Sequence, residues 1–139
     1  MRAAHLALIA LTAKLPAVSA ADLSVTVSGV RNAQGEVRIA VYDRAEGFRK
    51  EAQARARLAV PAAPGWVEAR FSGLPAGRYA VIAYHDEDGN GRLNLRFGMI
   101  PVEGYGLSNT PEVAGPPKFS DAAFELREPV GAIEVRLYY

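Results

Sequence analysis

The sequence predicts an all-β fold, an antiparallel Greek-key β-sandwich of about seven short strands with one long ordered loop and at most one short helix. Apolar and polar residues alternate with a period of two in several segments, as they do in strands that bury one face. Turn-forming residues separate these segments and include many of the 13 glycines and 9 prolines of the 139-residue chain. Only the segment 46–57 combines alanines and charged residues without a β-branched residue.

The first half of the chain contains three predicted strands. The segment 23–28 alternates apolar residues with serine and threonine, and the turn-forming segment 31–35 connects it to an alternating strand over 36–43, as in a hairpin. The mixed charges of 46–57 indicate a short helix or an irregular crossing with a solvated face. A short strand over 58–60 follows it.

The second half begins with an alternating strand over 66–71 and a turn over 72–77 whose glycines and proline favour special backbone angles. The segment 78–85 is almost uniformly apolar, which is typical of a central strand that is covered on both faces. Residues 86–118 show little periodicity, and ordered loops of that length inside a domain are usually functional. Two further strands complete the sandwich, over 119–126 and 132–139.

Residues 1–20 have the composition of a secretory signal peptide. Arg2 precedes an apolar run over 6–13, and small residues lead up to Ala20. We expect cleavage after Ala20, which leaves one sandwich domain over 21–139 and places the protein in the periplasm or outside the cell. The run is shorter than the roughly 20 apolar residues of a membrane-spanning helix. The alternative is an amphipathic N-terminal helix that stays attached.

The composition excludes several classes of protein. The chain has no cysteine, so disulfides, cysteine-ligated metals and thiol chemistry are impossible. Its formal net charge is +1, and removal of residues 1–20 leaves 14 basic and 15 acidic residues, a net charge of −1. Because the basic residues are dispersed, we expect no nucleic acid partner. We also expect no transmembrane segment after residue 20, and a monomer.

Residues 86–94 carry the clearest chemical signal in the sequence. Oxygen-bearing side chains stand at alternate positions, Gly91 is sixth and an apolar residue is eighth, as in the first nine positions of an EF-hand calcium loop. A chain that wraps a hard cation turns alternate side chains inward, and glycine permits the sharp bend. The predicted calcium ligands are the side chains of Asp86, Asp88, Asn90 and Asn94 and the backbone carbonyl of Arg92.

The loop departs from the EF-hand pattern at its end. The bidentate glutamate at position twelve is replaced by Phe97, so a calcium site needs another carboxylate, and Glu103 is the nearest downstream candidate. We expect modest affinity, with a dissociation constant of roughly 10⁻⁴–10⁻³ M, and a poorer fit to magnesium, which keeps more of its own waters. The alternative is a metal-free turn in which Asp and Asn side chains cap backbone N–H groups.

Four segments resemble the exported bacterial proteins grouped as domain-of-unknown-function family 2141. They are FSGLPAGRYAV over 71–81, HDEDGNGRL over 85–93, GMIPVEGYGLSN over 98–109 and PPKFSDAAF over 116–124. The resemblance covers most of the chain after residue 20 and implies no established activity. Where this sequence has Asn94, members of the family often carry aspartate, which implies weaker metal binding here.

The resemblance also implies a prealbumin-like or immunoglobulin-like sandwich. The segment 71–79 is similar to a hairpin of prealbumin-like domains. These domains include collagen-adhesin B-type repeats and carboxypeptidase regulatory domains. Those relatives are mostly binding, stalk or accessory modules.

We therefore predict an exported, non-enzymatic binding or accessory module with a calcium-ordered loop at 86–94. Its unknown partner would be a protein or a glycan of the cell envelope. The predicted ligand or partner surface consists of His85, Phe97, Met99, Ile100 and Tyr105. Two alternatives stay open: these side chains cap the end of the core, or the protein is a metal-free structural component of the envelope that acts through an exposed sheet edge.

A hydrolase that uses His85 is a further alternative. His85 is the only histidine after residue 20, and the fold could bring it to Ser108. Asp86 and Glu103 could act as paired carboxylates. No serine lies in a nucleophile-elbow motif, so the sequence predicts no catalytic residue.

Overall fold

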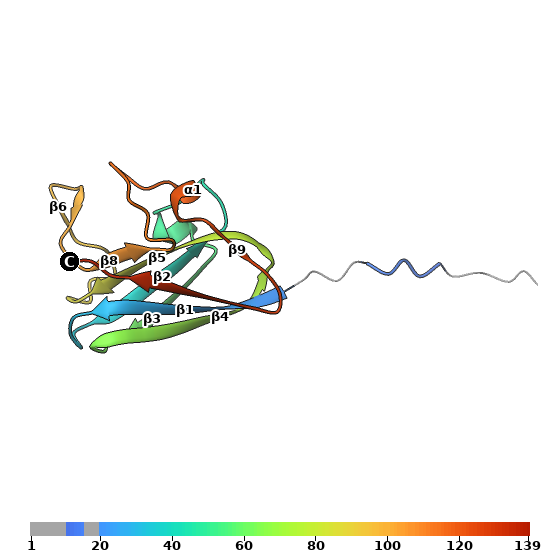
Figure 1. Ribbon diagram of the computed structural model, residues 1–139, viewed down its shortest axis with the longest axis horizontal. Coiled ribbons are helices and arrows are strands. Elements are labelled where there is room, and N and C mark those ends of the chain that lie inside the picture. Colours follow the sequence, from blue (N-terminus) through green and yellow to red (C-terminus); the bar gives the residue numbers. More distant parts are fainter. Residues whose placement is uncertain (1–10, 16–19) are drawn as a thin grey trace, which may run out of the picture.

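Two β-sheets packed face to face form the body of the protein (Figure 1). The structure, a computed structural model, describes residues 11–15 and 20–139. One sheet has the order β10 (Val130–Arg136), β1 (Ala20–Val30) and β4 (Gly65–Pro75). The other has the order β3 (Ala56–Pro61), β2 (Glu36–Tyr42), β5 (Gly77–Asp86) and β8 (Tyr105–Leu107), and β9 (Phe124–Leu126) pairs with the first residues of β5. The predicted all-β sandwich is confirmed.

The described residues contain ten strands rather than about seven. The difference arises in the predicted long loop 86–118, which holds β8 and a small hairpin of β6 (Leu95–Arg96) and β7 (Ile100–Pro101). The segment 46–57 contains a 3₁₀ turn, η1 (Glu51–Gln53), and the first two residues of β3. The long loop is therefore ordered by short strand pairs at one end of the sandwich.

Most of the predicted signal peptide, residues 1–10 and 16–19, lies outside the described residues. Residues 11–15 are exposed and have no regular secondary structure, and β1 begins at Ala20. Within 11–15 and 20–139, no helix has the length and apolar character that crossing a membrane requires.

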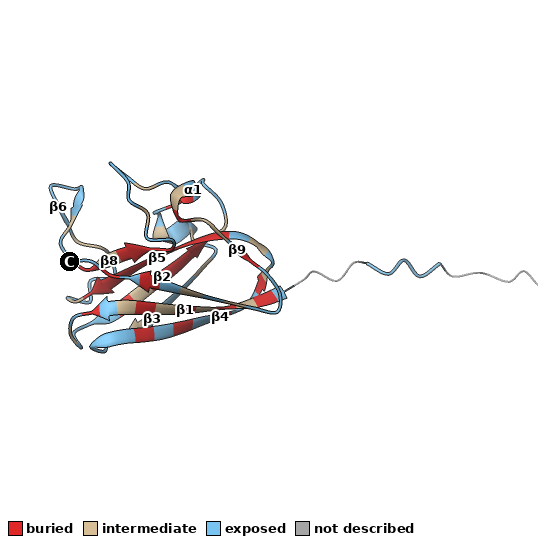
Figure 2. Ribbon diagram, viewed as in Figure 1, coloured by how far each residue is buried: buried red, intermediate tan, exposed pale blue. Residues whose placement is uncertain are grey.

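The main core lies between the two sheets. Alternate residues of β1, including Leu23, Val25 and Val27, are completely buried there. β2 and β5 are also buried on their outer face, where Ala40, Tyr42 and neighbouring side chains form a second cluster. Figure 2 shows this as nearly continuous burial along β5. The uniformly apolar segment 78–85 is thus a central strand that is covered on both faces.

The predicted hairpin between 23–28 and 36–43 is wrong. β1 pairs with β4 and, in parallel, with β10, whereas β2 pairs with β3 and β5 in the opposite sheet. Both arrangements turn the apolar side chains of β1 and β2 toward a core, so the alternating pattern cannot distinguish them. The turn at 31–35 crosses from one sheet to the other.

The predicted strand over 119–126 is wrong in its first half, which forms one helical turn, α1 (Phe119–Ala122). The side chain of Asp121 accepts a hydrogen bond of 2.7 Å from the backbone N–H of Lys118 and closes this turn. Phe119 and Ala122, three residues apart, are both buried on the outer cluster. A spacing of three suits a helix, whereas a strand would turn them to opposite faces.

Gly35, in the turn that precedes β2, packs against the backbone at the end of β5. Its φ of 67° is left-handed, and a Cβ at this position would overlap the backbone carbonyl oxygen of Asp86. Gly73 has a similar φ of 70° but no atom within 4 Å of its Cβ position. We expect Gly73→Ala to lower the free energy of unfolding by about 1–2 kcal/mol through backbone strain alone, and Gly35→Ala to lower it further.

Urea unfolding of the two variants measures the difference. Equal losses of stability would show that the backbone at position 35 does not pack against Asp86.

Candidate metal site

Three carboxylates from two segments of the chain converge at the end of β5. Asp86, Asp88 and Glu103 each offer one oxygen atom, and these oxygens lie within 4.8 Å of one another. Asp86 is completely buried, Asp88 is exposed, and Glu103, from the segment between β7 and β8, is only 6% exposed. The carboxylate predicted to replace the missing EF-hand glutamate therefore lies beside the two aspartates of the loop.

The side chain of Asp86 bends the loop back toward β5. Its two oxygens accept hydrogen bonds from the backbone N–H groups of Asn90, at 3.2 Å, and Gly91, at 2.8 Å. Gly89 and Gly91 adopt left-handed φ values of 67° and 76°, which glycine accepts without steric strain. The bend that the EF-hand pattern assigns to the sixth position is thus present.

Further side chains cap the backbone of this loop. Asp88 Oδ1 accepts a second hydrogen bond from the N–H of Asn90, at 3.2 Å, and Asn90 Oδ1 accepts one from the N–H of Arg92, at 3.0 Å. These are the contacts that the metal-free alternative predicts. They position Asp86, Asp88 and Asn90 without a cation.

Asn94 lies between two of the carboxylates. Its Nδ2 donates hydrogen bonds to Asp88 Oδ2, at 2.7 Å, and to Glu103 Oε1, at 2.5 Å. Its Oδ1 accepts a hydrogen bond from Asn90 Nδ2, at 2.5 Å. The positive end of the Asn94 amide dipole therefore lies between the two acidic groups and reduces their mutual repulsion.

Glu103 is the carboxylate whose ionised form its surroundings disfavour most. Burial raises its pKa to about 7, and the charges of Asp88, Asp86 and Glu87 add to the shift, while a hydrogen bond from Asn94 opposes it. Its Oε2 is buried and has no hydrogen-bond partner among residues 20–139. By contrast, the hydrogen bond from Asn94 lowers the pKa of Asp88, supported by the backbone N–H of Asn90.

The prediction that His85 belongs to a ligand or partner surface is wrong, because its side chain is completely buried. Its Nε2–H donates a hydrogen bond of 2.6 Å to the carbonyl oxygen of Gln34, so Nδ1 is the nitrogen that accepts the hydroxyl of Tyr139, at 2.8 Å. Both ring nitrogens are engaged, which argues against a role as a base. His85 instead ties the 31–35 turn and Tyr139 to the end of β5.

Ser108, the other residue of the hydrolase alternative, is also buried. Its hydroxyl donates to the carbonyl oxygen of Ala122, at 2.5 Å, and accepts the N–H of Val81, at 2.9 Å. These contacts give Ser108 a structural role beside α1.

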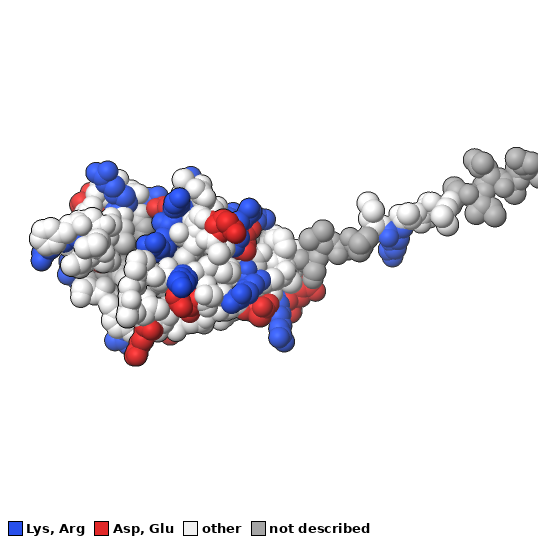
Figure 3. Space-filling model, turned by 90° about the horizontal axis from the view of Figure 1, so that it is seen from above, with Lys and Arg blue, Asp and Glu red and all other residues white. Residues whose placement is uncertain are grey.

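The β6–β7 hairpin exposes three of the predicted surface residues. Phe97, Met99 and Ile100 are 83%, 76% and 55% exposed. Phe97 and Gly98 both have positive φ, as in the tight turns that favour hairpins. In Figure 3, which is seen from above, charged side chains of both signs are interspersed on the visible face. Tyr105 is half-buried on β8 and lines a pocket that Arg92 also lines.

A family profile described as "Uncharacterized protein conserved in bacteria (DUF2141)" matches residues 25–134. The chain belongs to this family. Both parts of the acidic cluster, the loop at 86–94 and Glu103, lie within the DUF2141 match. Neither the curated proteins nor the solved structures contain a significant match to the chain.

The raised pKa of Glu103 predicts how the stability of the metal-free DUF2141 domain depends on pH. The folded protein holds this proton more tightly than the unfolded chain, so the ionisation of Glu103 destabilises the fold as pH rises from about 4.5 through about 7. We expect Glu103→Gln, which keeps an acceptor for Asn94, to be more stable than the unaltered protein at pH 8 and nearly equal to it at pH 4.

Melting temperatures in EDTA across this pH range provide the measurement, and Glu46→Gln, at an exposed loop position, is the matched control. A stability difference that does not change with pH would contradict the assigned cause.

Proposed function

We propose that this DUF2141 protein is an exported, non-enzymatic binding module whose loop at 86–94 is ordered by calcium. The observation that carries the proposal is the buried Oε2 of Glu103, which has no hydrogen-bond partner in residues 20–139 and lies in a cluster with Asp86 and Asp88. A buried acceptor without a partner destabilises a fold, as do neighbouring like charges. A bound divalent cation would remove both penalties.

The proposed ligands are oxygens, which suit a hard cation. The carboxylates of Asp86, Asp88 and Glu103 form the charged part of the set, and the loop pattern adds the side-chain oxygens of Asn90 and Asn94 and the carbonyl oxygen of Arg92. Because the Nδ2 of Asn94 now faces two carboxylates, binding requires the amide to turn and present Oδ1. Calcium takes six to eight oxygen ligands in flexible geometry, and this mixed set fits it better than magnesium.

The proposed role of calcium is to fix a binding surface. A cation held by Asp88 and Glu103 would join the loop after β5 to the segment that follows β7. The β6–β7 hairpin lies between these two points, with Phe97, Met99 and Ile100 exposed. Exposed apolar groups of this kind favour contact with a partner, here a protein or a glycan of the cell envelope. Export rests on the signal-peptide pattern of residues 1–20.

A second candidate, a metal-free structural protein of the envelope, is favoured by the capping contacts of Asp86, Asp88 and Asn90, which stabilise the loop without a cation. The two candidates differ in whether calcium binds at all.

Titration of the protein with calcium in a calorimeter tests the proposed function. We expect binding heat, a dissociation constant of roughly 10⁻⁴–10⁻³ M, and a melting temperature that rises with calcium concentration. Asp88→Asn and Glu103→Gln each remove one charged ligand and should weaken binding by about tenfold or more. Glu46→Gln should bind like the unaltered protein. Absence of both heat and a rise in melting temperature at millimolar calcium would overturn the proposal.

The substitution Asn94→Asp distinguishes the two candidate functions. In the calcium-binding protein it should lower stability in EDTA and yet strengthen calcium binding. The substitution removes the amide hydrogen bonds to Asp88 and Glu103 and adds a fourth negative charge, so it should destabilise the protein in EDTA. In the metal site it adds a charged ligand and should strengthen calcium binding by about tenfold.

Melting temperatures in EDTA and in millimolar calcium, together with the calcium titration, measure both effects. The control is Asn109→Asp, which loses an amide hydrogen bond to the carbonyl oxygen of Ala123, away from the cluster, and should be destabilised equally in both solutions. If Asn94→Asp behaves like this control, the loop is a capping turn.

A further inference from the structure

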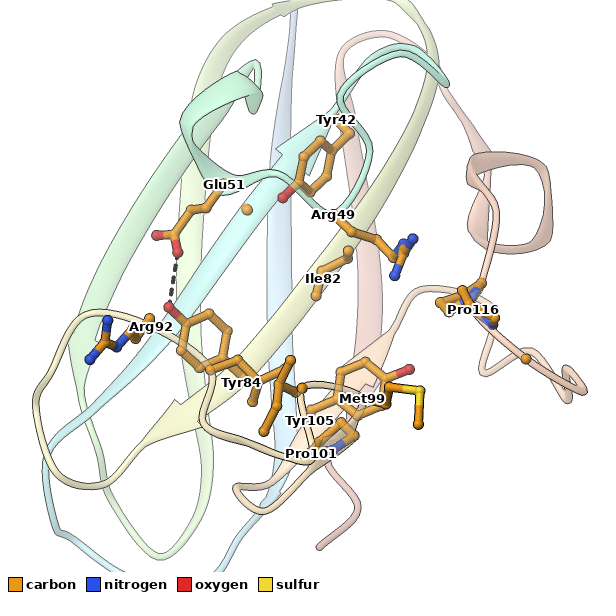
Figure 4. Close-up of a pocket in the computed structure, with 16 residues that line it drawn as sticks. Tyr42, Arg49, Glu51, Ile82, Tyr84, Arg92, Met99, Pro101, Tyr105 and Pro116 are labelled. Carbon is orange, nitrogen blue, oxygen red and sulfur yellow. Dashed lines mark hydrogen bonds between the residues drawn. The ribbon is translucent and has the colours of Figure 1, made fainter.

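The outer face of the second sheet contains a pocket of about 730 Å³ (Figure 4). This volume lies in the range of small-molecule sites. β2 and β5 form its floor, and the walls come from three loops that follow β2, β5 and β8. None of the three clustered carboxylates lines it; the pocket adjoins the calcium site proposed above only through Arg92, whose carbonyl oxygen is a proposed ligand.

Apolar and aromatic side chains form most of the pocket wall. Ile82 and Tyr84 project from β5, and Met99 and Pro101 close the pocket from the β6–β7 side. Tyr105, from β8, lies beside Met99 in the same view. A ligand that fills this space needs an apolar body, because the wall offers few polar atoms to satisfy a polar one.

The charged residues of the pocket leave an excess of positive charge. Glu51 is the only acidic side chain among its lining residues, and it is already paired with Arg38, at 2.9 Å, and with the hydroxyl of Tyr84, at 2.9 Å. Arg49 and Arg92 line the pocket from opposite sides. Neither guanidinium forms an ion pair or hydrogen bond with a residue of 20–139. In Figure 4 the guanidinium of Arg92 is directed away from the other labelled residues, so Arg49 is the cation best placed to receive an anion in the pocket.

Arg49 is the stronger anchor of the two. Figure 4 shows it beside Ile82, with its guanidinium directed toward the side of the pocket that Pro116 bounds. Its backbone is left-handed, with a φ of 70°, which is uncommon for a residue with a Cβ. The Tyr105 hydroxyl, whose pKa is raised by burial although the charge of Arg49 opposes the shift, can donate a hydrogen bond on the same side. A guanidinium matches the two oxygens of a carboxylate in bidentate geometry.

We propose that this pocket binds a small carboxylate with an apolar body, such as a medium-chain fatty acid, with the carboxylate at Arg49 and the apolar body over Ile82 and the Tyr84 ring. The positive charge of Arg49 favours the carboxylate of the ligand, and the apolar wall favours its hydrocarbon body. This site goes beyond the proposed function and requires no bound calcium.

Calorimetric titration with decanoate, with decan-1-ol as a neutral probe of the same chain length, tests the assignment on protein produced from the full sequence. We expect decanoate to bind and decan-1-ol to bind about tenfold more weakly. Arg49→Gln should weaken decanoate binding by about tenfold and leave decan-1-ol unchanged, whereas Met99→Asp should weaken both. Arg70→Gln, on an exposed position of β4 in the other sheet, is the matched control and should bind like the unaltered protein.

Three outcomes would overturn the proposal. No binding of decanoate would exclude this ligand class, and equal binding of the two probes would indicate a pocket for neutral ligands. If Arg70→Gln weakened decanoate binding as much as Arg49→Gln does, the effect would come from the overall charge of the protein and not from the pocket. Circular dichroism establishes that each variant is folded. If calcium fails to bind while decanoate binds as expected, the calcium proposal alone is overturned.

Discussion

Buried polar groups need hydrogen-bond partners, and this constraint organises the end of the sandwich where β5 stops. β5 ends in His85 and Asp86, both completely buried. His85 is bonded to Gln34 and Tyr139, and Asp86 to the backbone N–H groups of Asn90 and Gly91. Three segments far apart in the sequence are therefore held at one place. Replacement of either side chain by an apolar one would release the loops as well as leave polar atoms unpaired.

The same constraint is only partly met at Glu103. One carboxylate oxygen receives the amide of Asn94, and the other receives no partner from the described residues. Structural burial of a carboxylate is normally accompanied by full hydrogen bonding or by a cation. The unmet oxygen, rather than the number of acidic residues, distinguishes this cluster from an ordinary solvated group of charges.

Periodicity and motif spacing predicted much of this structure. The two-residue alternation identified the strands of the core, and the incomplete EF-hand spacing pointed to Asp86, Asp88 and Glu103, which the fold brings together. The same alternation could not show that β1 and β2 belong to different sheets, because each buries one face in either arrangement. The hydrogen-bond partners of His85 could not be predicted either, since Gln34 and Tyr139 lie about 50 residues away in either direction. The pocket could not be predicted for a similar reason: its residues come from segments between Ala40 and Pro117 that meet only in the folded chain.

The parallel pairing of β1 with β10 has a consequence for how the chain folds. Asp22 lies opposite Val130, and the register continues to Ser28 opposite Arg136, so the first sheet joins the two ends of the domain. Contacts between residues so distant in sequence form late and slowly. The first sheet cannot be completed before the last strand has been synthesised. Until then β1 can pair only with β4, and its other edge has no strand beside it.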